Sequence, residues 1–169
     1  DSACNLASLN LMKFRKEDGE FDAESFKYAV DITITAQEIF VDNASYPTPA
    51  IEKNSHAFRP LGLGYANLGT LLMMLGVPYD SDKGRSIAAA LTAIMHCHAF
   101  ATSAELSKAV GSFAGYEANK KPMLRVMEMH RAAAYKIDSN LAGSDLYSAA
   151  CEDADLAVKL GEQYGYRNA

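Results

Sequence analysis

Three cysteines are the side chains of this 169-residue sequence best suited to redox chemistry. Cys4 stands at the head of an alternating polar and apolar run, NLASLNL, whereas Cys97 and Cys151 lie within helical patterns. Two thiols that face a substrate can deliver two electrons by becoming a disulfide. A lone cysteine on a strand is more often a buried apolar residue, so a catalytic role for Cys4 needs further evidence.

Two histidines flank a cysteine in the segment His96, Cys97 and His98, as metal ligands often do. Side chains two positions apart on a helix point in nearly opposite directions, so His96 and His98 cannot hold one ion. We expect His98 to be a core histidine with a hydrogen bond and Cys97 to be a small buried hydrophobe. The Glu-x-x-His pairs of a di-iron bundle do not follow Glu38 or Glu128. We therefore predict no metal site.

Glycine and acidic clusters admit ordinary structural explanations. Gly62 and Gly64 begin a G-x-G pattern, but Asn67 stands where a dinucleotide-binding fingerprint has its third glycine. We expect a loop that leads into a helix and whose glycines allow close packing. The acidic run at residues 152–155 is predicted to be a solvated face that complements a helix dipole.

Hydrophobic periodicity predicts one strand followed by about five helices, a mainly α chain. The strand covers residues 3–14, with Cys4 and Leu6 on one face and apolar side chains on both, which is typical of a strand covered on both sides. The predicted helices cover residues 22–43, 64–75, 82–110, 122–135 and 144–164.

Local signals mark some of the boundaries. Asp22 is a good N-cap, and Phe21 and Phe26 occupy the two positions of a hydrophobic staple. Residues 44–61 contain three prolines and are predicted to be an irregular connection. Pro122 is expected in the first turn of its helix.

Composition argues against several classes of partner and location. The net charge of −5 is unfavourable for binding nucleic acid or an anionic membrane. We find no apolar run of the roughly 18 residues that span a bilayer and no signal peptide. The odd number and irregular spacing of the cysteines predict no disulfide among them and favour a reducing, cytoplasmic location.

A single strand cannot satisfy its own backbone hydrogen bonds. No other segment of the sequence reads convincingly as its neighbour, and the sequence begins at Asp1, inside the strand pattern. We therefore expect residues 1–169 to be an internal segment of a larger protein.

Two motifs carry a resemblance to a known family. CNLASLNL (residues 4–11) and FRPLGLGYANLGTLLMMLGVPYDS (residues 58–81) resemble segments of the large catalytic chain of ribonucleotide reductases. The sequence looks most like the adenosylcobalamin-dependent class II type. In that family a C-N-L-x-S-x-N-L segment precedes R-P-[IL]-G-[LI]-G, which is followed by L-G-[IV]-P-Y-D. The resemblance covers nearly the whole chain.

The resemblance implies a segment of a ten-stranded α/β barrel that converts ribonucleotides to deoxyribonucleotides by thiyl-radical chemistry. It places Cys4 as one of the redox pair, with its partner and the radical cysteine outside this chain. It also suggests that Leu6 borders the substrate sugar, and that Asn43 and Tyr46 approach the corrin of adenosylcobalamin. The implied partners are the ribonucleotide, a thioredoxin-like reductant and the rest of the reductase chain.

Other functions stay open at this point. One alternative is a class I reductase large chain, which uses a separate radical-generating subunit. Another is a stand-alone helical interaction module without catalysis. The sequence does not reveal a diphosphate or triphosphate preference, the allosteric effectors or the oligomeric state.

Overall fold

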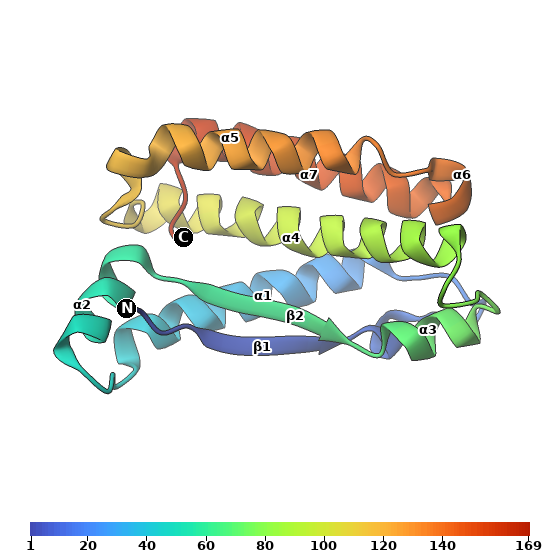
Figure 1. Ribbon diagram of the computed structural model, residues 1–169, viewed down its shortest axis with the longest axis horizontal. Helices are drawn as coiled ribbons and strands as arrows, with labels where there is room; N and C mark the ends of the chain where they lie inside the picture. The colour runs from blue at the N-terminus through green and yellow to red at the C-terminus, as the bar shows by residue number, and fades with distance from the viewer.

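The computed structural model describes residues 1–169 as a small sheet covered by helices (Figure 1). In chain order the elements are β1 (Asn5–Asn10), the 3₁₀ helix η1 (Leu11–Phe14), α1 (Ala23–Asn43), α2 (Pro49–Phe58), β2 (Leu61–Ala66), α3 (Leu68–Met74), α4 (Asp82–Val110), α5 (Tyr116–Ala134), α6 (Ser139–Ala142) and α7 (Ser144–Tyr164). Helix α1 lies behind the strands, α4 runs alongside them, and α5 and α7 form the outer layer (Figure 1). The chain is mostly helical, as predicted.

The strand near Cys4 has a partner that the sequence analysis missed. β1 pairs in parallel with β2, in a register that runs from Asn5 opposite Leu61 to Asn10 opposite Ala66. The expectation that no other segment of this chain pairs with the strand was wrong, and so was that of a loop-to-helix transition at Gly62 and Gly64. The period-2 alternation of β2 is present in LGLGYA, but glycines weaken a strand signal because they offer no side chain to pack.

Three further boundaries differ from prediction because of local capping. The strand ends at Asn10, whose side-chain oxygen accepts a hydrogen bond from the Met12 amide and starts a 3₁₀ turn. The connection predicted as irregular contains α2, where Thr48 caps the helix and Pro49 occupies its first turn. The helix predicted from residue 64 begins at Leu68.

The long helices agree better with prediction. α1, α4 and α7 match the predicted ranges closely, whereas α5 begins at Tyr116 and carries Pro122 inside it, and the short α6 was not predicted. The Asp22 side chain accepts a hydrogen bond from the Ser25 amide, as expected of an N-cap. The Phe21 and Phe26 rings pack edge to face with centroids 5.4 Å apart, which confirms the staple.

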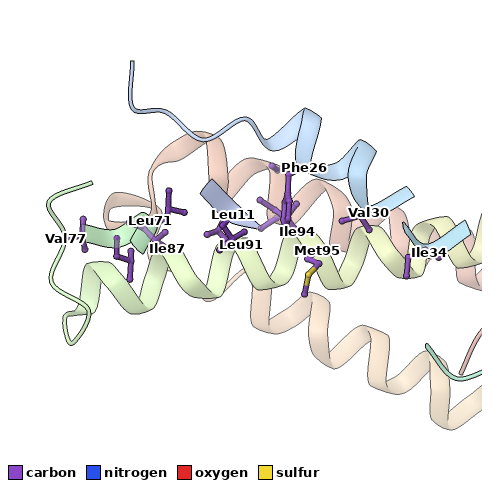
Figure 2. Close-up of a cluster of buried hydrophobic side chains, with 13 residues drawn as sticks. Leu11, Phe26, Val30, Ile34, Leu71, Val77, Ile87, Leu91, Ile94 and Met95 are labelled. Atoms are coloured by element: carbon purple, nitrogen blue, oxygen red, sulfur yellow. The ribbon is translucent and has the colours of Figure 1, made fainter. Parts of the chain in front are cut away.

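One apolar core joins the sheet to α1, α3 and α4 (Figure 2). Phe26 and Val30 of α1 and Leu91 and Ile94 of α4 are fully buried in it, and Leu11 fills the space where β1 ends. Each such side chain contributes about 1.5–3 kcal/mol by leaving water. This core fixes α1 against one face of the sheet.

A second core lies between α4, α5 and α7. Small residues, such as Ala104 of α4 and Ala157 of α7, are fully buried there and let the helices approach closely. The Tyr166 hydroxyl donates a hydrogen bond to the Ala157 carbonyl, and its ring occupies the space that a side chain at Gly161 would need. Gly161 is therefore required by packing.

α4 has the length and the apolar composition of a membrane-spanning helix, contrary to our expectation that no such run is present. Half of its most apolar window is buried inside the fold, where Ile87 and Leu91 contact the first core. Core helices meet the same criteria of length and composition, so this helix is weak evidence for a span.

A charged cluster joins α1, α4 and α7 around His98. His98 Nδ1 lies 3.1 Å from Asp153 Oδ1 and Nε2 lies 3.0 Å from Asp31 Oδ1, while Lys27 Nζ lies 3.3 Å from Asp153 Oδ2. Burial alone would lower the pKa of His98, but the hydrogen bond to Asp153 and the charges of both carboxylates raise it. His98 is thus a hydrogen-bonded core histidine, as predicted. Asp153 is 3% exposed, so the prediction of a solvated acidic face holds for Glu152 and Asp155 and was wrong for Asp153.

The His98 cluster predicts a pH-dependent stability. We expect His98→Gln to lower the free energy of unfolding by about 1.5 kcal/mol near pH 5.5, the lower end for a hydrogen bond to a charged group. The pKa of His98 is higher in the folded protein than its value of about 6.5 in the unfolded chain. The stabilisation by His98 is therefore complete below about pH 6.5 and is lost as the pH rises through the folded pKa. We would measure thermal unfolding of the wild type and of His98→Gln from about pH 5.5 to 8.5. The difference between their free energies of unfolding should narrow as the pH rises.

Arg85→Gln is the matched control for this prediction. Arg85 pairs with Asp80 and Asp82 in an exposed ion network, at 2.7 and 2.8 Å, where solvent screens the charges. Its unfolding temperature should stay close to that of the wild type at every pH. A His98→Gln gap that did not change with pH would show that folding does not raise the pKa of His98.

Candidate active-site face around Cys4

Cys4 lies directly before β1, on the side of the sheet that α1 leaves uncovered. Along β1 the side chains alternate: Asn5, Ala7 and Leu9 are half-buried toward the helices, whereas Leu6 and Ser8 are exposed. Cys4 is exposed, and 78% of Leu6 is accessible. Within this chain the strand is therefore covered on one face only, not on both. The structure brings Cys4 and Leu6 onto the same open face, as the alternation predicted.

β2 contributes backbone rather than side chains to this open face. The register sets Gly62 opposite Leu6 and Gly64 opposite Ser8. A Cβ atom at Gly62 would collide with the Leu6 side chain, which lies over that glycine. A strand glycine often marks a place where another group approaches the backbone closely. The open face consequently presents the Cys4 thiol, Leu6, the Ser8 hydroxyl and a stretch of bare main chain at the two glycines.

Cys4 carries the accessible thiol among the three cysteines. All three cysteines are free, which confirms the prediction of no disulfide. Burial raises the pKa of the Cys97 thiol to about 12 and also raises the pKa of Cys151. Cys97 is 2% exposed and packs in the second core, as predicted. Buried neutral thiols are poor nucleophiles, so the geometry leaves Cys4 as the candidate for redox chemistry.

A buried ionic network fixes the start of β2. Arg59 is 4% exposed and has the left-handed backbone angle φ of 51°. Its Nε donates to Glu38 Oε1 at 2.7 Å, and its other nitrogens donate to both Asp42 oxygens at 2.7 and 2.8 Å. Glu38 also accepts hydrogen bonds at 2.6 Å from Arg167 and Asn168. The hydrogen bond from Arg59 holds the pKa of Asp42 below its usual value.

This network was not predicted from the sequence. Glu38 and its neighbour Gln37 fall on the buried stripe of α1 with Val30 and Ile34, and both are nearly inaccessible. Buried polar groups are almost always hydrogen-bonded, so a polar residue within an apolar stripe was the available signal.

Asn43 and Tyr46 lie where α1 ends, near the end of the sheet at which β1 begins (Figure 1). The Asn43 amide donates to the Ile39 carbonyl at 2.9 Å, and the Tyr46 hydroxyl donates to the Val41 carbonyl at 2.8 Å. Burial raises the pKa of Tyr46. Both polar groups are thus engaged with the backbone of their own segment, and their contact with a cofactor stays a prediction.

His96 and His98 point to different helices, as their spacing predicted. His96 Nε2 lies 2.7 Å from His130 Nδ1 of α5, whereas His98 contacts α1 and α7. Burial and the nearby His130 lower the pKa of His96 to about 4. One of these two rings supplies the proton of their hydrogen bond.

Comparison with known proteins assigns the chain to a family. The family model for the ribonucleotide reductase barrel domain matches residues 1–169. A vitamin B12-dependent ribonucleotide reductase of Rhodopirellula baltica is 54% identical over all of this chain, and one of Streptomyces coelicolor is 47% identical. A ribonucleoside-diphosphate reductase large chain of Encephalitozoon cuniculi is 34% identical over 69% of this chain.

The chain spans only a small part of these relatives, 16% of the Rhodopirellula protein and 18% of the Streptomyces protein. The match nevertheless extends over every residue from Asp1 to Ala169, including the Cys4 motif and the β2 segment. The chain therefore belongs to the ribonucleotide reductase barrel-domain family.

Proposed function

We propose that this chain is part of an adenosylcobalamin-dependent ribonucleotide reductase in which Cys4 is one of the two redox thiols. The observation that carries the proposal is the accessible Cys4 thiol at the head of an otherwise uncovered sheet face. Relatives that match the whole chain at 42–54% identity bear the name vitamin B12-dependent ribonucleotide reductase. The large-chain relative is less similar and matches less of the chain, so the class I alternative is not favoured.

A barrel in the parent protein would explain why the two-stranded sheet has unpaired edges and one uncovered face. β1 and β2 form a two-stranded parallel sheet, and each strand has one free edge. Parallel sheets are found covered on both faces, and two strands alone are marginally stable. In the proposed parent barrel, neighbouring strands pair with both free edges, and the open face with Cys4 and Leu6 becomes the inner wall.

An open cavity of about 310 Å³ beside β2 supports this arrangement. It lies between Leu61 and Leu63 of β2 and Met95 and Phe100 of α4. The Ala169 amide donates to the Phe58 carbonyl at 2.9 Å, which brings the chain after α7 back to the start of β2. We infer that a further parallel strand of the barrel lies along β2 and fills this cavity with its side chains.

The proposed reaction assigns Cys4 a balanced redox step. Reduction of the ribonucleotide replaces the 2′-hydroxyl with hydrogen. Two thiols lose their S–H hydrogens and form one S–S bond, and the hydroxyl oxygen leaves as water. Cys4 supplies one thiol, and its partner lies outside this chain. A thioredoxin-like dithiol would then reduce the disulfide by thiol–disulfide exchange, which suits a cytoplasmic location.

Leu6 and Gly62 give this site an apolar wall next to the thiol. Leu6 lies two residues beyond Cys4 on the same face, and its side chain covers Gly62. We propose that Leu6 contacts the sugar and keeps water from the reacting carbon. Adenosylcobalamin supplies the radical when it is bound. Asn43 and Tyr46 each donate one hydrogen bond to the backbone of their own segment, and their contact with the cofactor stays a proposal, so we assign no step of this chain to the cofactor.

The proposal predicts that residues 1–169 alone have no reductase activity. One accessible thiol cannot deliver two electrons through an intramolecular disulfide, and Cys97 and Cys151 are buried. We expect no deoxynucleotide from the purified chain with a dithiol reductant, under conditions where the full-length reductase turns over. Product formation by the isolated chain would contradict the assignment of the second thiol to another part of the protein.

In the full-length reductase, Cys4→Ser should stop multiple turnover with a dithiol reductant. Serine cannot form the disulfide, whereas hydrogen exchange at the cofactor 5′-carbon should persist because it depends on the radical cysteine elsewhere. The unfolding temperature should change little, since serine is similar in size to cysteine and Cys4 is exposed in this chain. Turnover, exchange and unfolding are measured on the same preparation.

Cys97→Ser is the matched control. Its hydroxyl would be buried in the second core, at a cost of about 1–3 kcal/mol if it found no partner, while turnover per folded molecule should stay normal. Normal turnover of Cys4→Ser would remove Cys4 from the mechanism.

A further inference from the structure

Two buried polar side chains hold the backbone immediately before and after Cys4. Ser55 of α2 is 1% exposed, and its Oγ accepts a hydrogen bond from the Ala3 amide at 3.0 Å. The same hydroxyl lies 3.4 Å from the Ala3 carbonyl, to which it donates. Ser55 therefore binds both polar groups of the residue that precedes Cys4.

Gln37 of α1 plays the corresponding part for the residue that follows. It is 3% exposed, and its Nε2 donates to the Asn5 carbonyl at 3.1 Å and to the Gly62 carbonyl at 2.8 Å. In return, the Asn5 side-chain amide donates to the backbone carbonyl of Gln37 at 3.0 Å. One side chain thus ties β1, β2 and α1 together beside Cys4.

The Ser55 bonds lie outside the sheet, and the Gln37 bonds lie at its first residues. The ladder between the strands begins at Asn5 and Leu61, so Ala3 and Cys4 lie outside it. The Cys4 thiol makes no hydrogen bond of its own. Its position is consequently set by its backbone, which is held by Ser55 on one side and by Gln37 on the other.

Disulfide formation is sensitive to such placement. The two Cα atoms must lie about 4.4–6.8 Å apart and the torsion about the S–S bond must be near ±90°. A displacement of about 1 Å in a reacting group can cost roughly 100-fold in rate. A hydrogen-bonded backbone on both sides of the thiol limits that displacement.

We propose that Gln37 and Ser55 are positioning residues that hold Cys4 in the geometry required for disulfide formation during nucleotide reduction. This inference rests on the proposed function of Cys4. The step is the one described above: two S–H bonds break, one S–S bond forms, and the two electrons reduce the 2′-carbon as its hydroxyl leaves as water. Both side chains are buried, at 3% and 1% exposed, so neither can touch a substrate on the open face, and we expect substrate binding to be unaffected by their loss.

The test uses the full-length reductase with Gln37→Met and Ser55→Ala. Both variants remove the hydrogen bonds and keep the approximate volume. We expect kcat with a dithiol reductant to fall about 10-fold or more, with KM for the ribonucleotide within about two-fold of the wild type. In a single turnover without reductant, the disulfide of Cys4 should form more slowly by the same factor.

Ser107→Ala provides the matched control. Ser107 is also buried, and its hydroxyl donates to the Tyr164 carbonyl of another helix at 2.7 Å, within the α4–α7 packing. Its loss should lower the unfolding temperature about as much as Ser55→Ala does and leave kcat unchanged. Ser55→Thr keeps the hydroxyl and should restore kcat relative to Ser55→Ala.

Asn5→Ala keeps the experiment decisive if the other variants fold poorly. Asn5 is only half-buried, and this change removes one bond to Gln37 while leaving both Gln37 donors in place. We expect a smaller fall in kcat than in Gln37→Met. The inference is overturned if the folded variants keep the kcat of Ser107→Ala while Cys4→Ser abolishes turnover. If Cys4→Ser turns over normally, the proposed function itself fails.

Discussion

The parallel pairing of β1 with β2 is the constraint on which the rest of the structure depends. Parallel strands cannot be joined by a tight turn and need a crossover of a dozen or more residues. α1 and α2 form that crossover, and α1 covers one face of the sheet and leaves the other face open. Because side chains alternate along a strand, the same register that turns Leu9 toward the helices directs Cys4 and Leu6 to the open face. The connectivity thereby decides which face is available for chemistry.

The two ends of the sheet are stabilised in different ways. Where the strands end, Leu11, Leu71 and other apolar side chains form the first core (Figure 2). Where they begin, buried polar groups dominate: Ser55 and Gln37 beside β1, and the Arg59–Glu38 pair before β2. Buried charges and amides add little net stability because desolvation opposes their attraction, but they are directional. Directional bonds are concentrated at the end that carries the thiol.

Elements with local signals could be predicted from the sequence, and those set by distant partners could not. The start of α1 followed from Asp22, a cap that acts within one helical turn. β2 was missed because its glycines give a weak strand signal and its partner lies more than fifty residues earlier. α2 was missed because Pro49 was read as a breaker, although a proline directly after a capping threonine begins a helix. The redox role that we propose for Cys4 rests on family resemblance, since a lone cysteine carries no such information.

α1 shows how one helix can serve both packing and placement. Its buried stripe is apolar through Phe26, Val30 and Ile34 and becomes polar at Gln37 and Glu38. The apolar half needs only a complementary surface, so many sequences would satisfy it. The polar half needs specific partners, and each of them comes from a strand segment or from the residues after α7. A slip of β1 by one residue would leave the Gln37 donors unpaired and would turn Cys4 toward the helices. The polar half of α1 therefore selects the register in which the thiol faces the open side.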